Sequence, residues 1–101
     1  MMIVVTASVR IRPEHREAAV RAALTMADAT RREAGCRAYR FSADLADPAL
    51  FYVHEEWESA EALAQHFATP HMAEFNRQIP AFLAAPPEIT RFEVSAAGPL
   101  A

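Results

Sequence analysis

Residues 37–57, RAYRFSADLADPALFYVHEEW, decide the fold class of this chain, because they hold two alternating segments around a short break. In both halves, apolar or aromatic residues recur at every second position, which is the spacing of a β-strand. Asp47-Pro48 interrupts the pattern as a turn does. We therefore predict an antiparallel hairpin with strands at 37–44 and 50–57 and a turn at 45–48.

On the N-terminal side of this hairpin, the sequence predicts one strand and one long helix. Residues 3–11 alternate between apolar and more polar positions, as a strand does. Pro13 stands where the first turn of a helix can begin. The segment from Glu14 to Ala34 has helical periodicity, and Gly35 is suited to end that helix.

On the C-terminal side, the pattern predicts two helices and a last strand. Ser59 and Thr69 are good N-cap residues, and Pro80 should shorten the end of the second helix. The predicted elements are a helix over Ala60–Phe67, a helix from Pro70 to about Leu83, a strand over Glu88–Ser95 and a tail at 96–101.

The order β-α-β-β-α-β predicts an α+β fold of the ferredoxin-like type, a four-stranded antiparallel sheet with its helices on one face. We expect one domain over residues 1–101, with a core at about 3–95, since the chain has a mass of only 11.2 kDa. Apolar residues make up 52% of the chain, and the strands carry large side chains on both faces. The second sheet face, with Tyr52 and His54, is therefore expected to pack on another copy in a homodimer.

Composition excludes several classes of protein. A single cysteine, Cys36, leaves no internal disulfide and no cysteine-based zinc site, so a reducing cytoplasm is the expected compartment. The longest uncharged apolar run, MMIVVTASV, has about half the length of a membrane span, and we expect no membrane segment. The net charge is −3 and the arginines are scattered, so no nucleic acid is expected as a partner. Only two glycines are present, which excludes a glycine-rich nucleotide loop.

An ordered set of short motifs resembles a known family. The set consists of E-x-G-C-x-x-Y (33–39), D-P-x-x-F-Y-V-H-E-x-W-E-S (47–59), A-L-A-Q-H-F (62–67) and T-P-H-M-x-x-F (69–75). No single motif is specific, but in this order, over roughly residues 3–95, they resemble the antibiotic biosynthesis monooxygenase family, which includes small quinol monooxygenases. The resemblance implies a dimeric α+β barrel with a cavity between sheet and helices. It also implies oxidation of phenolic, quinol or anthrone-type aromatics by O₂ without a metal or flavin cofactor.

Two histidines are the candidate catalytic residues. His66 is expected at the edge of the apolar face of a short helix, where an imidazole can take a proton from a phenol. His71, in the first turn of the next helix, is a second candidate for handling protons. Each has a structural alternative, as a boundary histidine bonded to the backbone or a residue that packs between helices. We expect no metal site, because Pro70 separates the two histidines and they do not share a helix face.

The expected substrate pocket combines one carboxylate with apolar and aromatic side chains: Phe51, Glu55, Trp57, Leu63, Phe67 and Phe75. Glu55 lies in an apolar row, so it should find a partner or have a raised pKa. Trp57 can form a wall for an aromatic ligand and donate one hydrogen bond. The alternative for both residues is ordinary core packing with an ion pair.

The sequence therefore favours a cofactor-independent monooxygenase that acts on a small aromatic substrate with O₂. Two alternatives stay open: a non-catalytic module that binds a ligand in the same cavity, and an isomerase of a small metabolite that needs no O₂. Haem-degrading relatives are disfavoured, because the resemblance to that branch requires an Asn on the first strand. That strand reads IVVTASVRI and has none.

Overall fold

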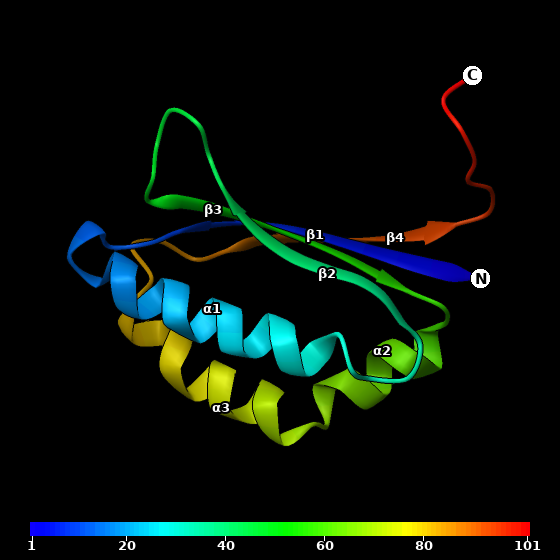
Figure 1. The fold of residues 1–101 in the computed structure, drawn as a ribbon, viewed down its shortest axis with the longest axis horizontal. Helices are drawn as coiled ribbons and strands as arrows, with labels where there is room; N and C mark the ends of the chain where they lie inside the picture. The colour runs from blue at the N-terminus through cyan, green and yellow to red at the C-terminus, as the bar shows by residue number, and fades with distance from the viewer.

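The computed structural model describes residues 1–101 and has four strands and three α-helices. The elements are β1 (Met2–Arg10), a 3₁₀ turn (Pro13–His15), α1 (Arg16–Thr30), β2 (Cys36–Ala43), β3 (Leu50–Trp57), α2 (Ala60–Phe67), α3 (Pro70–Gln78), a 3₁₀ turn (Ile79–Ala81) and β4 (Glu88–Val94). The strands form one antiparallel sheet in the order β2-β3-β1-β4, with all helices on one face (Figure 1). The ferredoxin-like α+β fold expected from the sequence is confirmed.

The hairpin that the sequence predicted pairs in the expected antiparallel manner. Tyr39 stands opposite Glu55 across β2 and β3, and Phe41 stands opposite Val53. These side chains share the sheet face that the helices cover. The main core lies between this face and α1 and α2, and its buried members are Ile3, Val5, Met26, Ala27, Tyr39, Val53, Trp57, Ala62 and Leu63.

The long helix ends earlier than the sequence suggested. It stops at Thr30 rather than Ala34, because the chain tightens there: the N–H of Glu33 donates to the Thr30 carbonyl at 3.0 Å, three residues back. Gly35 then takes the left-handed conformation, with φ of +83°, as expected for a helix-ending glycine. Glu33 therefore lies on a turn instead of a helix, and its side chain is free to reach another element.

Side-chain caps fix where the next two helices begin. The Ser59 hydroxyl accepts a hydrogen bond from the N–H of Ala62 at 3.1 Å, and the Thr69 hydroxyl accepts one from Met72 at 3.3 Å. These caps place His66 in the last turn of α2 and His71 in the first turn of α3. The 3₁₀ turn at Ile79–Ala81 ends α3 where Pro80 was expected to shorten it. None of the helices has the length and apolarity needed to cross a membrane.

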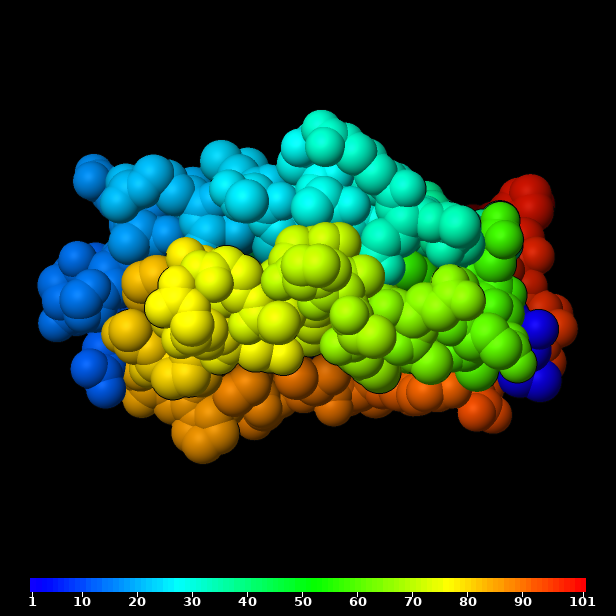
Figure 2. Space-filling view, turned by 90° about the horizontal axis from the view of Figure 1, so that it is seen from below, coloured from blue at the N-terminus to red at the C-terminus, as the bar shows by residue number.

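The helices cover β1, β2 and β3 but leave the edge strand β4 open. Viewed from the helical side, β4 extends in orange beyond the edge of α2 and α3 (Figure 2). Ile89 pairs with Ala7 on this covered side of the sheet, yet 65% of its surface is exposed. Access to the space between sheet and helices is therefore available beside β4.

Candidate functional site

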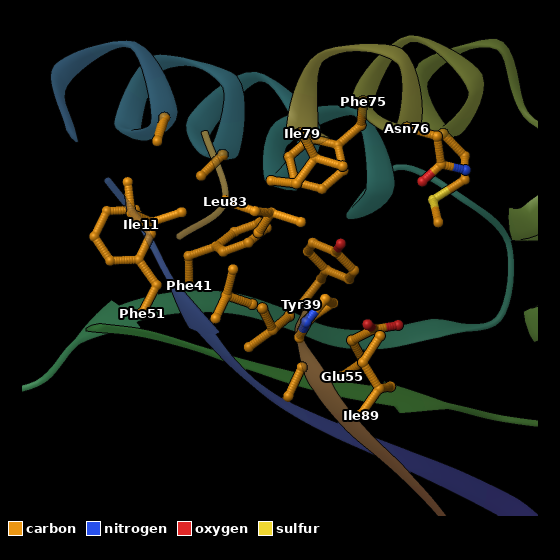
Figure 3. A pocket seen from close by; sticks show the side chains of 17 residues that line it. Ile11, Tyr39, Phe41, Phe51, Glu55, Phe75, Asn76, Ile79, Leu83 and Ile89 are labelled. Carbon is orange, nitrogen blue, oxygen red and sulfur yellow. The ribbon is translucent and has the colours of Figure 1, made fainter. Parts of the chain in front are cut away.

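A cavity of about 170 Å³ lies between the sheet and the helices, and 14 of its 17 lining residues are hydrophobic. At one end, Ile11, Phe41, Phe51 and Leu83 form an apolar wall (Figure 3). Ile89 also lines the cavity, so its exposed side chain marks the opening toward solvent. This space suits a small apolar ligand that enters beside β4.

Three of the lining side chains carry polar groups: Tyr39 from β2, Glu55 from β3 and Asn76 from α3 (Figure 3). Burial raises the pKa of Glu55, an effect that the hydrogen bond from Trp57 opposes. Burial and the nearby Glu55 carboxylate also raise the pKa of the Tyr39 phenol. The Tyr39 hydroxyl is therefore a stable hydrogen-bond donor, and Glu55 is a stronger base than an exposed glutamate.

Two histidines outside the lining of this cavity contact the same carboxylate oxygen. Oε2 of Glu33 lies 2.7 Å from Nδ1 of His66 and 2.7 Å from Nε2 of His71. A carboxylate oxygen accepts hydrogen bonds, so both ring nitrogens donate to it. His66 is 1% exposed, while the side chains of Glu33 and His71 are 12% and 23% exposed. The cluster is thus buried on the His66 side and reaches solvent on the His71 side.

Trp57 connects this cluster to the cavity. Its indole ring packs against the His66 ring with a centroid separation of 4.8 Å. Nε1 of Trp57 donates a hydrogen bond to Oε1 of Glu55 at 2.9 Å. A continuous set of contacts therefore runs from Glu33 through His66 and Trp57 to the carboxylate that lines the cavity.

This arrangement of sheet, helices and cavity agrees with a family assignment from the sequence. Residues 2–78 match the model of the family described as antibiotic biosynthesis monooxygenase. The chain belongs to this family.

Several proteins are similar to this member of the antibiotic biosynthesis monooxygenase family. The uncharacterised protein sll1783 of Synechocystis is 32% identical over 92% of the chain, and the alignment spans 63% of the longer relative. The structure of PA3566 from Pseudomonas aeruginosa is 32% identical, covers 94% of this chain and 95% of that one, and has a TM-score of 0.86. The structure of Rv0793 from Mycobacterium tuberculosis is 25% identical, covers 98% and 100%, and has a TM-score of 0.91.

Only some of the residues that the sequence predicted for the pocket line the cavity. Phe51, Glu55 and Phe75 line the cavity. Trp57 and Leu63 lie fully buried in the core beside it, and the Phe67 side chain is mostly exposed. Trp57 reaches the cavity through its hydrogen bond to Glu55, so its contribution there is to hold that carboxylate.

His66 and His71 do not line the cavity; they meet at Glu33 instead. They do not share a helix face, as expected, but the expectation that this keeps them apart was wrong, because both contact Glu33 across the turn at Ala68 and Thr69. Their rings lie 6.0 Å apart. Helix-face geometry applies within one helix, and these residues belong to two.

Sequence reasoning did not select Glu33, Tyr39 or Asn76. Tyr39 could have been found, because the hairpin register places it directly opposite Glu55 on the same face. Glu33 gave no local signal, since its partners lie 33 and 38 residues further along the chain. Asn76 is one of many polar residues on a short helix, and only the packing of α3 shows that it meets the cavity.

Proposed function

We propose that this chain is a cytoplasmic, homodimeric, cofactor-independent monooxygenase that oxidises a single-ring phenol or hydroquinone with O₂. The observation that carries the proposal is the cavity: it is apolar apart from a tyrosine, a glutamate and an asparagine. Membership of the antibiotic biosynthesis monooxygenase family supports the reaction class.

The size of the cavity favours one aromatic ring. A dry protein cavity of about 150 Å³ is known to hold benzene, and the cavity here measures about 170 Å³. A fused three-ring anthrone would require α3 or the segment before β4 to move. The substrate class that fits best is therefore a hydroquinone or phenol whose apolar edge faces Phe41 and Phe51.

The polar side chains can activate such a ring. Glu55, whose pKa is raised by burial, accepts the proton of a ring hydroxyl. The Tyr39 hydroxyl and the Asn76 amide can donate hydrogen bonds to the electron-rich phenolate that results. The phenolate then reduces O₂ directly. One oxygen atom bonds to a ring carbon and the other leaves as water, so that hydroquinone and O₂ give hydroxyquinone and water, and the substrate supplies all the electrons.

His66 and His71 remain candidate residues, now with an indirect role. His66 packs against Trp57, and Trp57 holds the carboxylate of Glu55. We therefore propose that His66 positions the base and that His71, through Glu33, supports His66. A positioning role predicts that loss of His66 disturbs the pH profile of turnover as well as its rate.

Oxygen uptake with a single-ring hydroquinone, in the presence of a metal chelator, tests the proposal. Glu55→Gln should lower kcat/KM by about 10²-fold or more, since general-base loss costs ~10²–10⁴-fold. Glu56→Gln is the matched control, because Glu56 is the next residue of β3 and points to the opposite sheet face. It should retain the wild-type rate. His66→Gln should lower kcat/KM at least about tenfold and shift the pH profile.

Two other results would favour the alternative functions. Binding of hydroquinones without any O₂ uptake would indicate a ligand-binding module, and the bound ligand would then raise the melting temperature without product. Turnover of a small metabolite under anaerobic conditions would indicate an isomerase. Equal rates for Glu55→Gln and the wild-type protein would contradict the assignment of Glu55 as the base.

A further inference from the structure

We propose that Glu33, His66 and His71 form a binding site for a divalent transition metal of the zinc class, separate from the cavity. The three side chains come from three segments: the turn after α1, the last turn of α2 and the first turn of α3. Their facing ligand atoms all lie within 4.8 Å of one another. Two imidazoles and a carboxylate are a donor set that zinc accepts with three protein ligands.

The charge around Glu33 favours a cation. Its side chain is largely buried, and both of its hydrogen-bond partners are histidines. Arg31, two residues earlier, does not pair with it, because the Arg31 guanidinium donates to the Tyr39 carbonyl at 2.9 Å. A second carboxylate, Glu55, lies close enough for the two to repel one another. No arginine pairs with Glu33, and a bound metal ion would place a full positive charge beside this largely buried carboxylate.

The present distances describe a hydrogen-bonded state that a metal would open slightly. Ligand atoms on a tetrahedral zinc lie about 3.3 Å apart, given bond lengths of about 2.0–2.1 Å. The two contacts of 2.7 Å must therefore each lengthen by about 0.6 Å. Glu33 lies on a turn, so rotation of its side chain can lengthen these contacts. The two histidine nitrogens, which lie within 4.8 Å of each other, must in turn move closer together. A histidine binds a metal through an unprotonated nitrogen, so the proton that each ring donates to Glu33 must move to the other ring nitrogen or leave.

A metal ion and its fourth ligand can reach the site from the side of His71. His71 is partly exposed at the start of α3, whereas His66 is closed off by Trp57 and Tyr39. A metal held there could take water as its fourth ligand, as open three-ligand zinc sites do. None of the three proposed ligands lines the cavity, so the metal site is separate from it. We therefore assign it a role in joining α2 and α3 to the turn after α1.

Zinc titration of the full chain, stripped of metal by a chelator and then dialysed, tests this site. Calorimetry should show one Zn²⁺ bound per chain, and zinc should raise the melting temperature. Trp57 is the only tryptophan and packs against His66, so Ni²⁺ at the same site should quench its fluorescence. His71→Ala and Glu33→Gln should each weaken Zn²⁺ binding at least about tenfold, the scale on which ligand-shell changes act.

His54→Ala provides the matched control. His54 also faces a glutamate, Glu56, at 2.8 Å, but this pair lies on the opposite sheet face and lacks a third ligand. Its substitution should leave zinc affinity and Ni²⁺ quenching unchanged. Equal zinc affinity in His71→Ala and the wild-type protein would overturn the proposal, as would the absence of zinc binding to the wild-type chain at about 100 μM, a weak affinity for such a site. If His71→Ala does not fold, His71→Gln, which retains a hydrogen-bond donor, decides the same question.

Discussion

Glu55 carries a negative charge in surroundings that disfavour it, and this has a measurable consequence for stability. Burial raises the pKa of Glu55 above its ordinary value of 4.5. The folded state therefore favours the protonated carboxyl. The stability that this preference provides is complete below the unfolded pKa and is lost as the pH rises through the folded pKa.

Glu55→Gln cannot ionise, so it should escape that loss. We expect the melting temperature of Glu55→Gln, relative to wild type, to increase from about pH 4 to about pH 8. Asp44→Asn should show the opposite trend at lower pH, because the hydrogen bond from Tyr52 lowers the pKa of Asp44 below its ordinary value of 3.8. The stability that this provides to the wild-type protein is present above that value and is lost as the pH falls through the folded pKa. Thermal melts at about pH 4 and about pH 8 measure the first difference, and melts at about pH 4 and about pH 2 measure the second. If the difference in melting temperature between Glu55→Gln and wild type does not change with pH, then Glu55 has the same pKa in the folded and unfolded states.

At the level of residues, the sequence predicted what depends on a single strand and missed what depends on packing. The alternation of β3 placed Glu55 on the apolar face, and the structure gives it both the partner and the raised pKa that were expected as alternatives. The sequence could not place His66 behind Trp57, because that contact depends on how α2 crosses the sheet. It also could not pair Glu33 with residues far along the chain.

At the level of elements, the turn after α1 is tightly constrained at Gly35. Gly35 adopts φ of +83°, and a Cβ built there would lie 2.5 Å from the Cβ of Ala62 on α2. The absence of a side chain thus allows both the left-handed backbone and the close approach of α2. This turn also carries Glu33, so its geometry sets the position of the histidine cluster.

Gly35→Ala should therefore destabilise the protein by about 2–4 kcal/mol, combining left-handed strain with overpacking against α2. Gly98→Ala is the matched control, because nothing lies within 4 Å of the Cβ that it would add. Its free energy of unfolding should stay within about 0.5 kcal/mol of wild type. Denaturant unfolding measures both. Similar values for the two variants would mean that α2 can move away from the turn at little cost.

Element types and order were predictable because strand alternation, N-cap residues and prolines act locally. The hairpin, the starts of α2 and α3, and the shortened end of α3 all follow from such signals. The end of α1 was not predictable. Ala, Arg and Glu are all good helix formers, so residues 31–34 give no stop signal before Gly35, although the helix ends at Thr30.

At the level of the whole molecule, one face of the sheet has no helix over it (Figure 1). On that face, Phe92 of β4 stands opposite Val4 of β1, and 49% of Phe92 is exposed. Tyr52 of β3 is also exposed on this face. Exposed aromatic side chains on an uncovered sheet face favour association with a second copy, which is the homodimer expected from the apolar composition.

Phe92→Asp tests this prediction. The wild-type protein should sediment at about twice 11.2 kDa at micromolar concentration, and Phe92→Asp should weaken association at least about tenfold, because it replaces an exposed aromatic side chain of the expected interface by a charge. Leu24→Asp is the control, since Leu24 is also apolar and 64% exposed but lies on α1, which covers the other face of the sheet. It should remain dimeric. A monomeric wild-type chain would contradict the homodimer, whereas a dimeric Phe92→Asp would place the interface on another surface.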